Sequence, residues 1–225
     1  MTRRMIGELY TSGVSSSPAP IGPYERRPAA VRPWDPRLPE VAARVIAIIR
    51  RARPDLVVEH IGSTAVPGLP GKGIVDLGTE ADPAEIPAIT EAMYAIGFGP
   101  QPGPDPWPPT RPMHVGSIQH DGEEYRIHFH VHQRGTGDLA KDIRFRDALR
   151  ADPALRDGYA RTKAGIVGPA GGQVDAVRYQ AEKGEWILET FDEMGIPRPL
   201  NVQGGPVGEA GGPEPPTDPI PSVQP

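Results

Sequence analysis

The stretch from His60 to Asp76 contains the residue types that a phosphate-handling site needs. Gly62 and Ser63 follow a short apolar run, and backbone without a Cβ lets N–H groups approach an anion closely. Lys72 adds a point charge suited to phosphate, and Asp76 places a carboxylate in the next apolar run. A strand, a glycine-rich loop and a second strand with an acid are the usual layout of a nucleotide-transferring site. We therefore predict that Gly62, Ser63 and Lys72 bind phosphate and that Asp76 and Ser63 are catalytic.

A second set of candidate ligands lies further along the chain, where apolar residues alternate with histidines: Ile127, His128, Phe129, His130, Val131 and His132. This alternation predicts a strand with one apolar face and one face of imidazoles. Two neutral imidazoles two positions apart can ligate a single metal ion. His128 and His130 would then form a metal site with Asp76. The alternative is that these histidines are exposed strand residues or hydrogen-bonded residues of a cleft.

Three pairs of polar side chains stand four positions apart in the C-terminal third: Arg146 with Arg150, Tyr159 with Lys163, and Tyr179 with Lys183. Residues at this spacing share one face of a helix, so each pair would point in a common direction. Two arginines placed in this way repel each other on a free helix, which favours an anionic partner. Salt bridges to nearby aspartates such as Asp142, Asp147 or Asp152 are the alternative.

The hydrophobic pattern predicts the elements that would position these side chains. An i, i+4, i+7, i+8 stripe predicts an amphipathic helix over about 38–52. Asp121-Gly122 separates two strand-like runs, about 113–120 and 123–132, which is typical of a β-hairpin. Helical patterns follow the hairpin to the end of the folded part. This order of elements indicates a mixed α+β domain.

Proline and glycine are abundant, with 30 and 27 residues, and they concentrate at the two ends and in one internal segment. Such ends bury too little apolar surface to offset the entropy of ordering. We predict a disordered N-terminal segment over 1–29, a folded domain over 30–196 and a disordered Pro/Gly-rich tail over 197–225. Residues 100–112 are predicted to form a stiff surface loop that flanks the site through Trp107 and Arg111.

The run that begins at His60 resembles the GrpB family, whose pattern is His-(Ile/Val)-Gly-Ser-Thr-(Ser/Ala)-Val-Pro-Gly-Leu, two small residues, then Lys-Pro-Ile-Ile-Asp. In this chain His60 to Leu69 is followed by Pro70-Gly71 and by Lys72-Gly73-Ile74-Val75-Asp76. The resemblance covers about residues 31–192 and includes a His-x-His dyad at His128 and His130. It implies a nucleotidyltransferase-like mixed β-sheet flanked by helices, with C-terminal helices closing a cleft.

The same resemblance implies ligand-binding residues in the C-terminal half: Arg146, Arg150, Tyr159, Lys163 and Lys183. It also implies Mg²⁺ or another divalent metal at Asp76, because nucleotidyl transfer normally runs through a metal held by acidic residues. The fold normally carries a second acid two positions further along the strand. This chain has Gly78 there, which argues against a two-metal mechanism.

Composition excludes several classes of function. There is no cysteine, so disulfides, thiolate catalysis and Cys-ligated zinc are excluded. The net charge of -5 argues against a general nucleic-acid binder. No apolar run approaches the roughly 18 residues that a transmembrane helix needs. We therefore expect a cytoplasmic protein whose partner is a nucleotide or another phosphorylated small molecule, and no membrane association.

Two functions from different classes remain open. The first is a metal-dependent nucleotidyltransferase, or a related protein that binds a nucleotide or other phosphate-containing ligand. The second is a non-catalytic accessory domain on the same fold, associated with coenzyme A metabolism, because GrpB-like domains resemble fusion partners of dephospho-coenzyme A kinase. The intact glycine-serine loop favours the first, and Gly78 favours the second.

Overall fold

The computed structural model describes residues 19–102, 107–168, 174 and 176–197. In this part of the chain the elements are, in order, α1 (Leu38–Ala52), β1 (Glu59–Ile61), the 3-10 helix η1 (Ser63–Ala65), β2 (Val75–Ala81), α2 (Ile86–Ala95), β3 (Gly99–Pro100), β4 (Met113–His120), β5 (Glu123–Gln133), α3 (Asp138–Ala151), α4 (Pro153–Val167) and α5 (Ala176–Glu193). The predicted mixed α+β class is therefore confirmed. None of the described helices combines the length and the apolar character needed to cross a bilayer.

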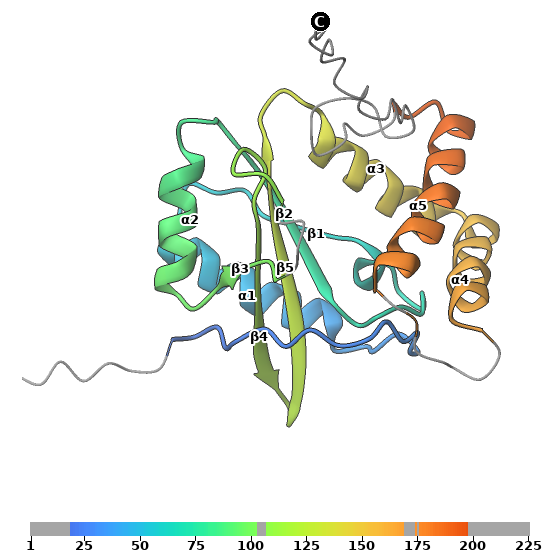
Figure 1. The fold of residues 1–225 in the computed structure, drawn as a ribbon, viewed down its shortest axis with the longest axis horizontal. Helices are drawn as coiled ribbons and strands as arrows, with labels where there is room; N and C mark the ends of the chain where they lie inside the picture. Colours follow the sequence, from blue (N-terminus) through green and yellow to red (C-terminus); the bar gives the residue numbers. More distant parts are fainter. Residues whose placement is uncertain (1–18, 103–106, 169–173, 175, 198–225) are drawn as a thin grey trace, which may run out of the picture.

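The described strands form a single mixed sheet in the order β1-β2-β5-β4-β3 (Figure 1). The hairpin strands β4 and β5 pair antiparallel, and β5 then pairs parallel with β2. The short strand β1 continues the sheet by pairing antiparallel with β2. The glycine-serine loop between β1 and β2 therefore lies near the β1 edge of the sheet. It is next to the pairing of β2 with β5, the one parallel pairing among the described strands.

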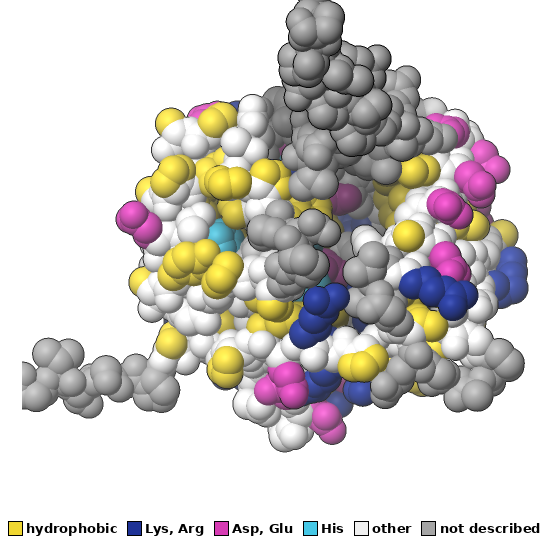
Figure 2. All heavy atoms as spheres, in the orientation of Figure 1, with side chains coloured by type: hydrophobic (Ala, Val, Ile, Leu, Met, Phe, Trp, Pro, Cys, Tyr) yellow, Lys and Arg dark blue, Asp and Glu magenta, His cyan; other side chains and the backbone are white. Residues whose placement is uncertain are grey.

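The two faces of the sheet are covered by different helices. Helices α1 and α2 lie on one face, and α3, α4 and α5 lie on the other (Figure 1). The main hydrophobic core is on the α1/α2 side, where Val45 and Ile49 of α1 meet Leu77 and Phe129 of the sheet, all fully buried. Alternate residues of a strand point to opposite faces, so Asp76, His128 and His130 project toward α3–α5. Figure 2 shows charged side chains over the C-terminal helices and more hydrophobic ones over α2.

The hairpin forms where the sequence predicts it. Asp121 and Gly122 both have positive φ, 49° and 78°. Positive φ at both central residues is the geometry of a type I′ turn, whose twist matches that of the flanking strands. Helix α1 also has the predicted bounds. At 99–100 the proline-rich segment contributes the short strand β3, which lies at the sheet edge, where a proline lacking an N–H is tolerated.

The N-terminal segment differs from the expectation of disorder over 1–29. Residues 1–18 lie outside the described part of the chain, but within 19–29 the residues Ile21, Gly22 and Tyr24 contact the sheet. Ile21 is 2% exposed, and Gly22 exchanges two backbone hydrogen bonds with Ser117 of β4. Ile21 fits because its neighbour is Gly116, where a Cβ would lie 2.3 Å from Ile21 Cγ2. The predicted tail lies outside the described residues from 198 onward.

Candidate functional site

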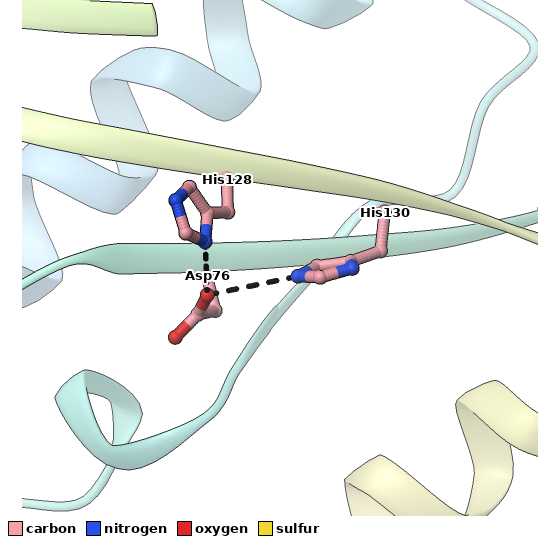
Figure 3. Close-up of side chains that lie close together, drawn as sticks. All are labelled: Asp76, His128 and His130. Atoms are coloured by element: carbon pink, nitrogen blue, oxygen red, sulfur yellow. Dashed lines mark ion pairs between the residues drawn. The ribbon is translucent and has the colours of Figure 1, made fainter. Parts of the chain in front are cut away.

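The candidate metal ligands meet because of the register between β2 and β5. In this parallel pairing Asp76 lies opposite His128, and Gly78 lies opposite His130. Neighbouring strands are about 4.8 Å apart, and residues two positions apart share a face. The three side chains therefore converge on the face that α3–α5 cover, and Figure 3 shows both imidazoles pointing to the Asp76 carboxylate.

The distances suit a single metal ion. Asp76 Oδ1 lies 3.4 Å from His128 Nδ1 and 3.6 Å from His130 Nε2. Across the three side chains, all three potential ligand atoms lie within 4.8 Å of one another. Two donors bound to one tetrahedral zinc ion at 2.0–2.1 Å would be about 3.3 Å apart. The residues present therefore fit a metal held by two imidazoles and one carboxylate, which brings together the predicted ligands Asp76, His128 and His130.

The protonation states suit ligation as well. Burial lowers the pKa of the His128 imidazole, which leaves it neutral at neutral pH. Burial alone would raise the pKa of the Asp76 carboxyl, but the imidazoles of His128 and His130 outweigh it and hold that pKa well below its usual range. A neutral imidazole and an ionised carboxylate are the forms that bind metals.

The glycine-serine loop lies directly against this cluster. Gly62 has φ 69°, and a Cβ on it would lie 2.6 Å from Asp76 Oδ2, so glycine is required both by conformation and by space. Ser63 begins η1, and a Cβ on Gly71 would lie 2.8 Å from Ser63 Oγ. Gly62, one of the predicted phosphate-binding residues, therefore lies against the cluster, and Ser63 follows it at the start of η1.

The loop is fixed by side chains that donate to its backbone carbonyls from outside: Trp34 Nε1 to Thr64 at 3.1 Å, Arg146 Nη1 to His60 at 2.9 Å, Arg150 to Ala65 at 2.9 and 2.7 Å, and Lys163 Nζ to Pro70. Within the loop, His60 Nε2 and Thr64 Oγ1 are 3.0 Å apart, as expected for a histidine that holds the loop. Buried carbonyls need such partners. These hydrogen bonds hold the loop in one conformation, although its glycines would allow many.

These contacts bear on the arginines and on the tyrosine-lysine pair of α4. Arg146 also pairs with Glu59 and Asp147, and Arg150 pairs with Asp147. Tyr159 is 5% exposed, and the ammonium of Lys163, itself 1% exposed, lies 4.4 Å above its ring. The structure shows loop and core contacts for these side chains. Phosphate binding stays a prediction for all four of them: Arg146, Arg150, Tyr159 and Lys163.

Two other predicted cations lie near the carboxylate. Lys72 Nζ lies 5.1 Å above the ring of Tyr179 in α5, and burial lowers the pKa of its amine. Burial also lowers the pKa of Lys183 to about 8, with the charge of Lys72 acting in the same direction and that of Asp76 opposing it. Two lysines from different elements therefore share one environment with Asp76, an arrangement suited to an anion.

Position 78 is crowded where the second acid would project. A Cβ on Gly78 would lie 2.7 Å from Leu139 Cδ1 of α3 and 3.0 Å from Ile61 Cδ1 of β1. Helix α3 packs against this strand where an acid would project. The packing at position 78 therefore agrees with the glycine that the sequence has in place of a second acid.

Two contacts of the β5 histidines were not predicted from the sequence. The Tyr24 hydroxyl lies 3.1 Å from His128 Nε2, although Tyr24 belongs to the segment predicted to be disordered. Asp142 Oδ2 lies 3.4 Å from Nε2 of His132, which is 1% exposed. Residues 19–29 have no helical or strand periodicity, so the sequence gives no pattern from which the Tyr24 contact could be predicted. Trp107, which was expected to flank the site, does so, because its ring meets His130 edge-on at 5.5 Å.

A mixed sheet with a glycine-serine turn after one strand, a carboxylate on the next and helices over that face has the layout of a nucleotidyltransferase-like fold. Within this class, the chain belongs to the GrpB family, because the family profile, described as GrpB protein, matches residues 28–193. A solved structure of conserved protein GrpB from Enterococcus faecalis has the same fold, with a TM-score of 0.53 and 20% identity. The likeness covers 73% of this chain and 98% of that one.

Curated relatives agree with this assignment. UPF0157 protein BH1888 of Halalkalibacterium halodurans is 35% identical over 133 residues, which are 58% of this chain and 65% of that protein. Dephospho-CoA kinase of Mycobacterium tuberculosis is 26% identical over 190 residues, which are 74% of this chain and 46% of the kinase. The chain thus spans from about a third to two thirds of the length of the curated relatives it matches.

Proposed function

We propose that this protein binds a divalent transition metal at Asp76, His128 and His130, together with a nucleotide or another phosphate-containing ligand. The observation that carries the proposal is the spacing of the three ligand atoms around one point, with 3.4 and 3.6 Å between the carboxylate oxygen and the two imidazole nitrogens. Two nitrogens and one oxygen suit Zn²⁺ and similar ions, whereas Mg²⁺ prefers an all-oxygen shell. We therefore favour a transition metal over the Mg²⁺ of a typical nucleotidyltransferase.

The phosphate part of the proposal is supported by charge and by loop geometry. Lys72, Lys183 and Asp76 are all half-buried and the charge of Asp76 acts on both lysines, so a bound divalent ion would add two further positive charges to one environment. Half-buried cations favour an anionic ligand more strongly than fully exposed ones, because water screens them less. Gly62 brings the loop backbone against Asp76, so a phosphate held by the loop would lie next to the metal. The metal would supply a Lewis acid that neutralises charge on the phosphate.

A second candidate function has its own support. The similarity to mycobacterial dephospho-CoA kinase extends over 74% of this chain but only 46% of the kinase. Gly78 leaves a single carboxylate where transfer enzymes of this fold use two, and α3 fills the space. A non-catalytic accessory domain that binds a coenzyme A precursor or product would keep the loop and lysines without transferring a group.

Thermal unfolding and titration calorimetry would test the metal site. The full chain is measured with Zn²⁺, Mn²⁺, Co²⁺ and Mg²⁺, each alone and with ATP, UTP or coenzyme A. An ion at 100 times its dissociation constant should stabilise the protein by about 2.7 kcal/mol. We expect this stabilisation for Zn²⁺ or Co²⁺, and its loss in Asp76→Asn. Asp157→Asn is the matched control, because Asp157 pairs only with the adjacent Arg156 among the described contacts.

The outcomes separate the two functions. Metal-dependent stabilisation by a nucleotide, with release of pyrophosphate on incubation, supports the transferase. Metal-dependent stabilisation by coenzyme A without turnover supports the accessory domain. The proposal is wrong if no ion changes the unfolding temperature, or if Asp76→Asn binds the ion as tightly as the unchanged chain.

A further inference from the structure

The N-terminal segment crosses the site face of the sheet and is held on both sides of Tyr24. Upstream, Ile21 is buried and donates its N–H to Ile96 at 3.1 Å, and Gly22 pairs with Ser117 of β4. Downstream, Arg27 pairs with Glu124 at 2.6 Å. Figure 1 shows this segment running across β4 and β5 on its way to α1. Tyr24 is therefore placed over β5 by contacts that do not involve its own side chain.

The Tyr24 side chain contacts one candidate metal ligand. Its hydroxyl lies 3.1 Å from His128 Nε2, and the two ring centroids are 5.4 Å apart. The other ring nitrogen of His128, Nδ1, is the one that faces Asp76 Oδ1 at 3.4 Å. The imidazole is thus held at both nitrogens, by a carboxylate on one side and by a phenol on the other.

Arg126 also lies near Tyr24. Burial raises the pKa of the phenol, and Arg126 acts against this larger effect by lowering it. Arg126 Nη2 donates to the Lys72 carbonyl at 3.3 Å. Arg126 therefore connects the surroundings of Tyr24 with the glycine-rich loop.

We propose that Tyr24 is a positioning residue, which holds the His128 ring so that Nδ1 is the nitrogen that binds the metal beside Asp76. The inference rests on the proposed metal site and adds a residue outside the family match, which begins at residue 28. Metal-binding histidines usually donate their second ring N–H to an outer partner, which fixes both the tautomer and the ring orientation. A phenol can act as this partner because its oxygen both donates and accepts hydrogen bonds.

The proton positions in the two states follow from the partners. Without metal, the ionised Asp76 accepts Nδ1–H, and Nε2 accepts the Tyr24 O–H. With metal on Nδ1, the ring proton moves to Nε2, which donates to the Tyr24 oxygen. Tyr24 changes from donor to acceptor, and the ring keeps its orientation in both states. Phenylalanine fills the same space and can do neither.

The metal-free chain provides the first test. Ring ¹⁵N resonances of His128, assigned with His128→Gln, are compared in the unchanged chain and in Tyr24→Phe. We expect a single Nδ1–H tautomer in the unchanged chain, and in Tyr24→Phe a shift of Nε2 to the position of a lone pair without a hydrogen bond. Tyr125→Phe is the matched control, because its hydroxyl, on the same strand, bonds Asp35 at 2.7 Å. Identical His128 resonances in Tyr24→Phe and the unchanged chain would overturn the proposal.

Metal affinity provides the second test, by calorimetry with Zn²⁺ and Co²⁺ on variants whose melting shows that they are folded. Loss of an outer partner costs about 10- to 100-fold in affinity, which we expect for Tyr24→Phe and not for Tyr125→Phe. An affinity within twofold of the unchanged chain would overturn the positioning role. If the unchanged chain itself binds neither ion, the proposed metal site fails, and with it the ligand role of His128. The ¹⁵N comparison still shows whether the Tyr24 contact exists.

Discussion

Lys163 is a buried cation whose partners carry no charge. Its ammonium donates to the Pro70 carbonyl and lies 4.4 Å above the Tyr159 ring, and the residue is 1% exposed. Burial therefore lowers its pKa from 10.5 to about 7, with the charge of Lys183 acting in the same direction. In the folded protein this amine is half protonated near neutral pH, whereas in the unfolded chain it is almost fully protonated.

This difference predicts how stability changes with pH. Between pH 7 and about 10.5 the unfolded chain binds more protons at Lys163 than the folded chain, so the free energy of unfolding should rise with pH. One such group contributes at most about 1.4 kcal/mol per pH unit. We expect Lys163→Met to reduce the slope measured by urea unfolding between pH 7 and 9.5. Below about pH 6 the amine is protonated in both states, and Lys163 contributes no further slope.

The control for this experiment is Arg161→Met on the same helix, because a guanidinium group stays protonated throughout this range. Arg161→Met should keep the slope of the unchanged chain. Equal slopes in Lys163→Met and the unchanged chain would contradict the assignment of Lys163 as a neutralised buried amine, and would mean that it is charged when folded.

At the scale of elements, the contact between β2 and α3 depends on Gly78. We predict that Gly78→Ala lowers the free energy of unfolding by about 1–3 kcal/mol, the usual cost of overpacking. Its Cβ would lie 2.7 Å from Leu139 Cδ1. Urea unfolding should also show that Leu139→Ala, destabilising on its own, makes the added methyl group less costly. Gly99→Ala is the control, because nothing lies within 4 Å of a Cβ there.

Strictly additive effects of Gly78→Ala and Leu139→Ala would contradict a direct contact between these positions, since residues in contact couple by about 0.5–3 kcal/mol. The same packing explains why a second acid at position 78 would not restore a two-carboxylate site by itself. The Leu139 and Ile61 side chains would have to shift first.

The elements themselves were predictable where the signal is local. The stripe of α1 and the Asp121-Gly122 hairpin depend on residues close in sequence, and both are confirmed. The cap of α4 is also local, because the Asp152 carboxylate accepts from the N–H groups of Ala154 and Leu155. The turn and the cap follow from local backbone and capping chemistry, and the stripe follows from the spacing of apolar residues on one helix face.

The site was predictable only in part, for a physical reason. The sequence identified Asp76, His128 and His130, but their meeting depends on the register between β2 and β5, which local patterns do not encode. Arg146 and Arg150 show the same limit. Their spacing indicates a shared face, but not that the face meets the carbonyls of His60 and Ala65. A donor suited to phosphate is equally suited to a peptide carbonyl.

At the scale of the whole molecule, the N-terminal segment is part of the fold. We predict that Ile21→Ala lowers the free energy of unfolding by about 2–5 kcal/mol, the usual cost of truncating a buried isoleucine. Ile21 is 2% exposed and packs beside Phe98 and Gly116. Val57→Ala is the control, because Val57 is 67% exposed. Chemical denaturation of both variants checks the prediction.

A loss below about 0.5 kcal/mol in Ile21→Ala would favour the original boundary near residue 30, with 19–29 attached only loosely. A large loss would place the start of the folded domain upstream of residue 21. It would also mean that a chain begun at residue 30 lacks part of its hydrophobic core as well as Tyr24.

The parallel pairing of β2 with β5 has a consequence for the order of folding. Asp76 and His128 are 52 positions apart in the chain, and α2, β3 and β4 come between β2 and its partner β5. Local elements such as the hairpin form within microseconds, whereas non-local pairings must first meet the entropy of closing a long loop. The cluster should therefore assemble late, after α1, α2 and the hairpin. In refolding, the contact between Asp76 and His128 would form only once β2 and β5 pair, and a nascent chain would gain the whole cluster only after β5 has emerged.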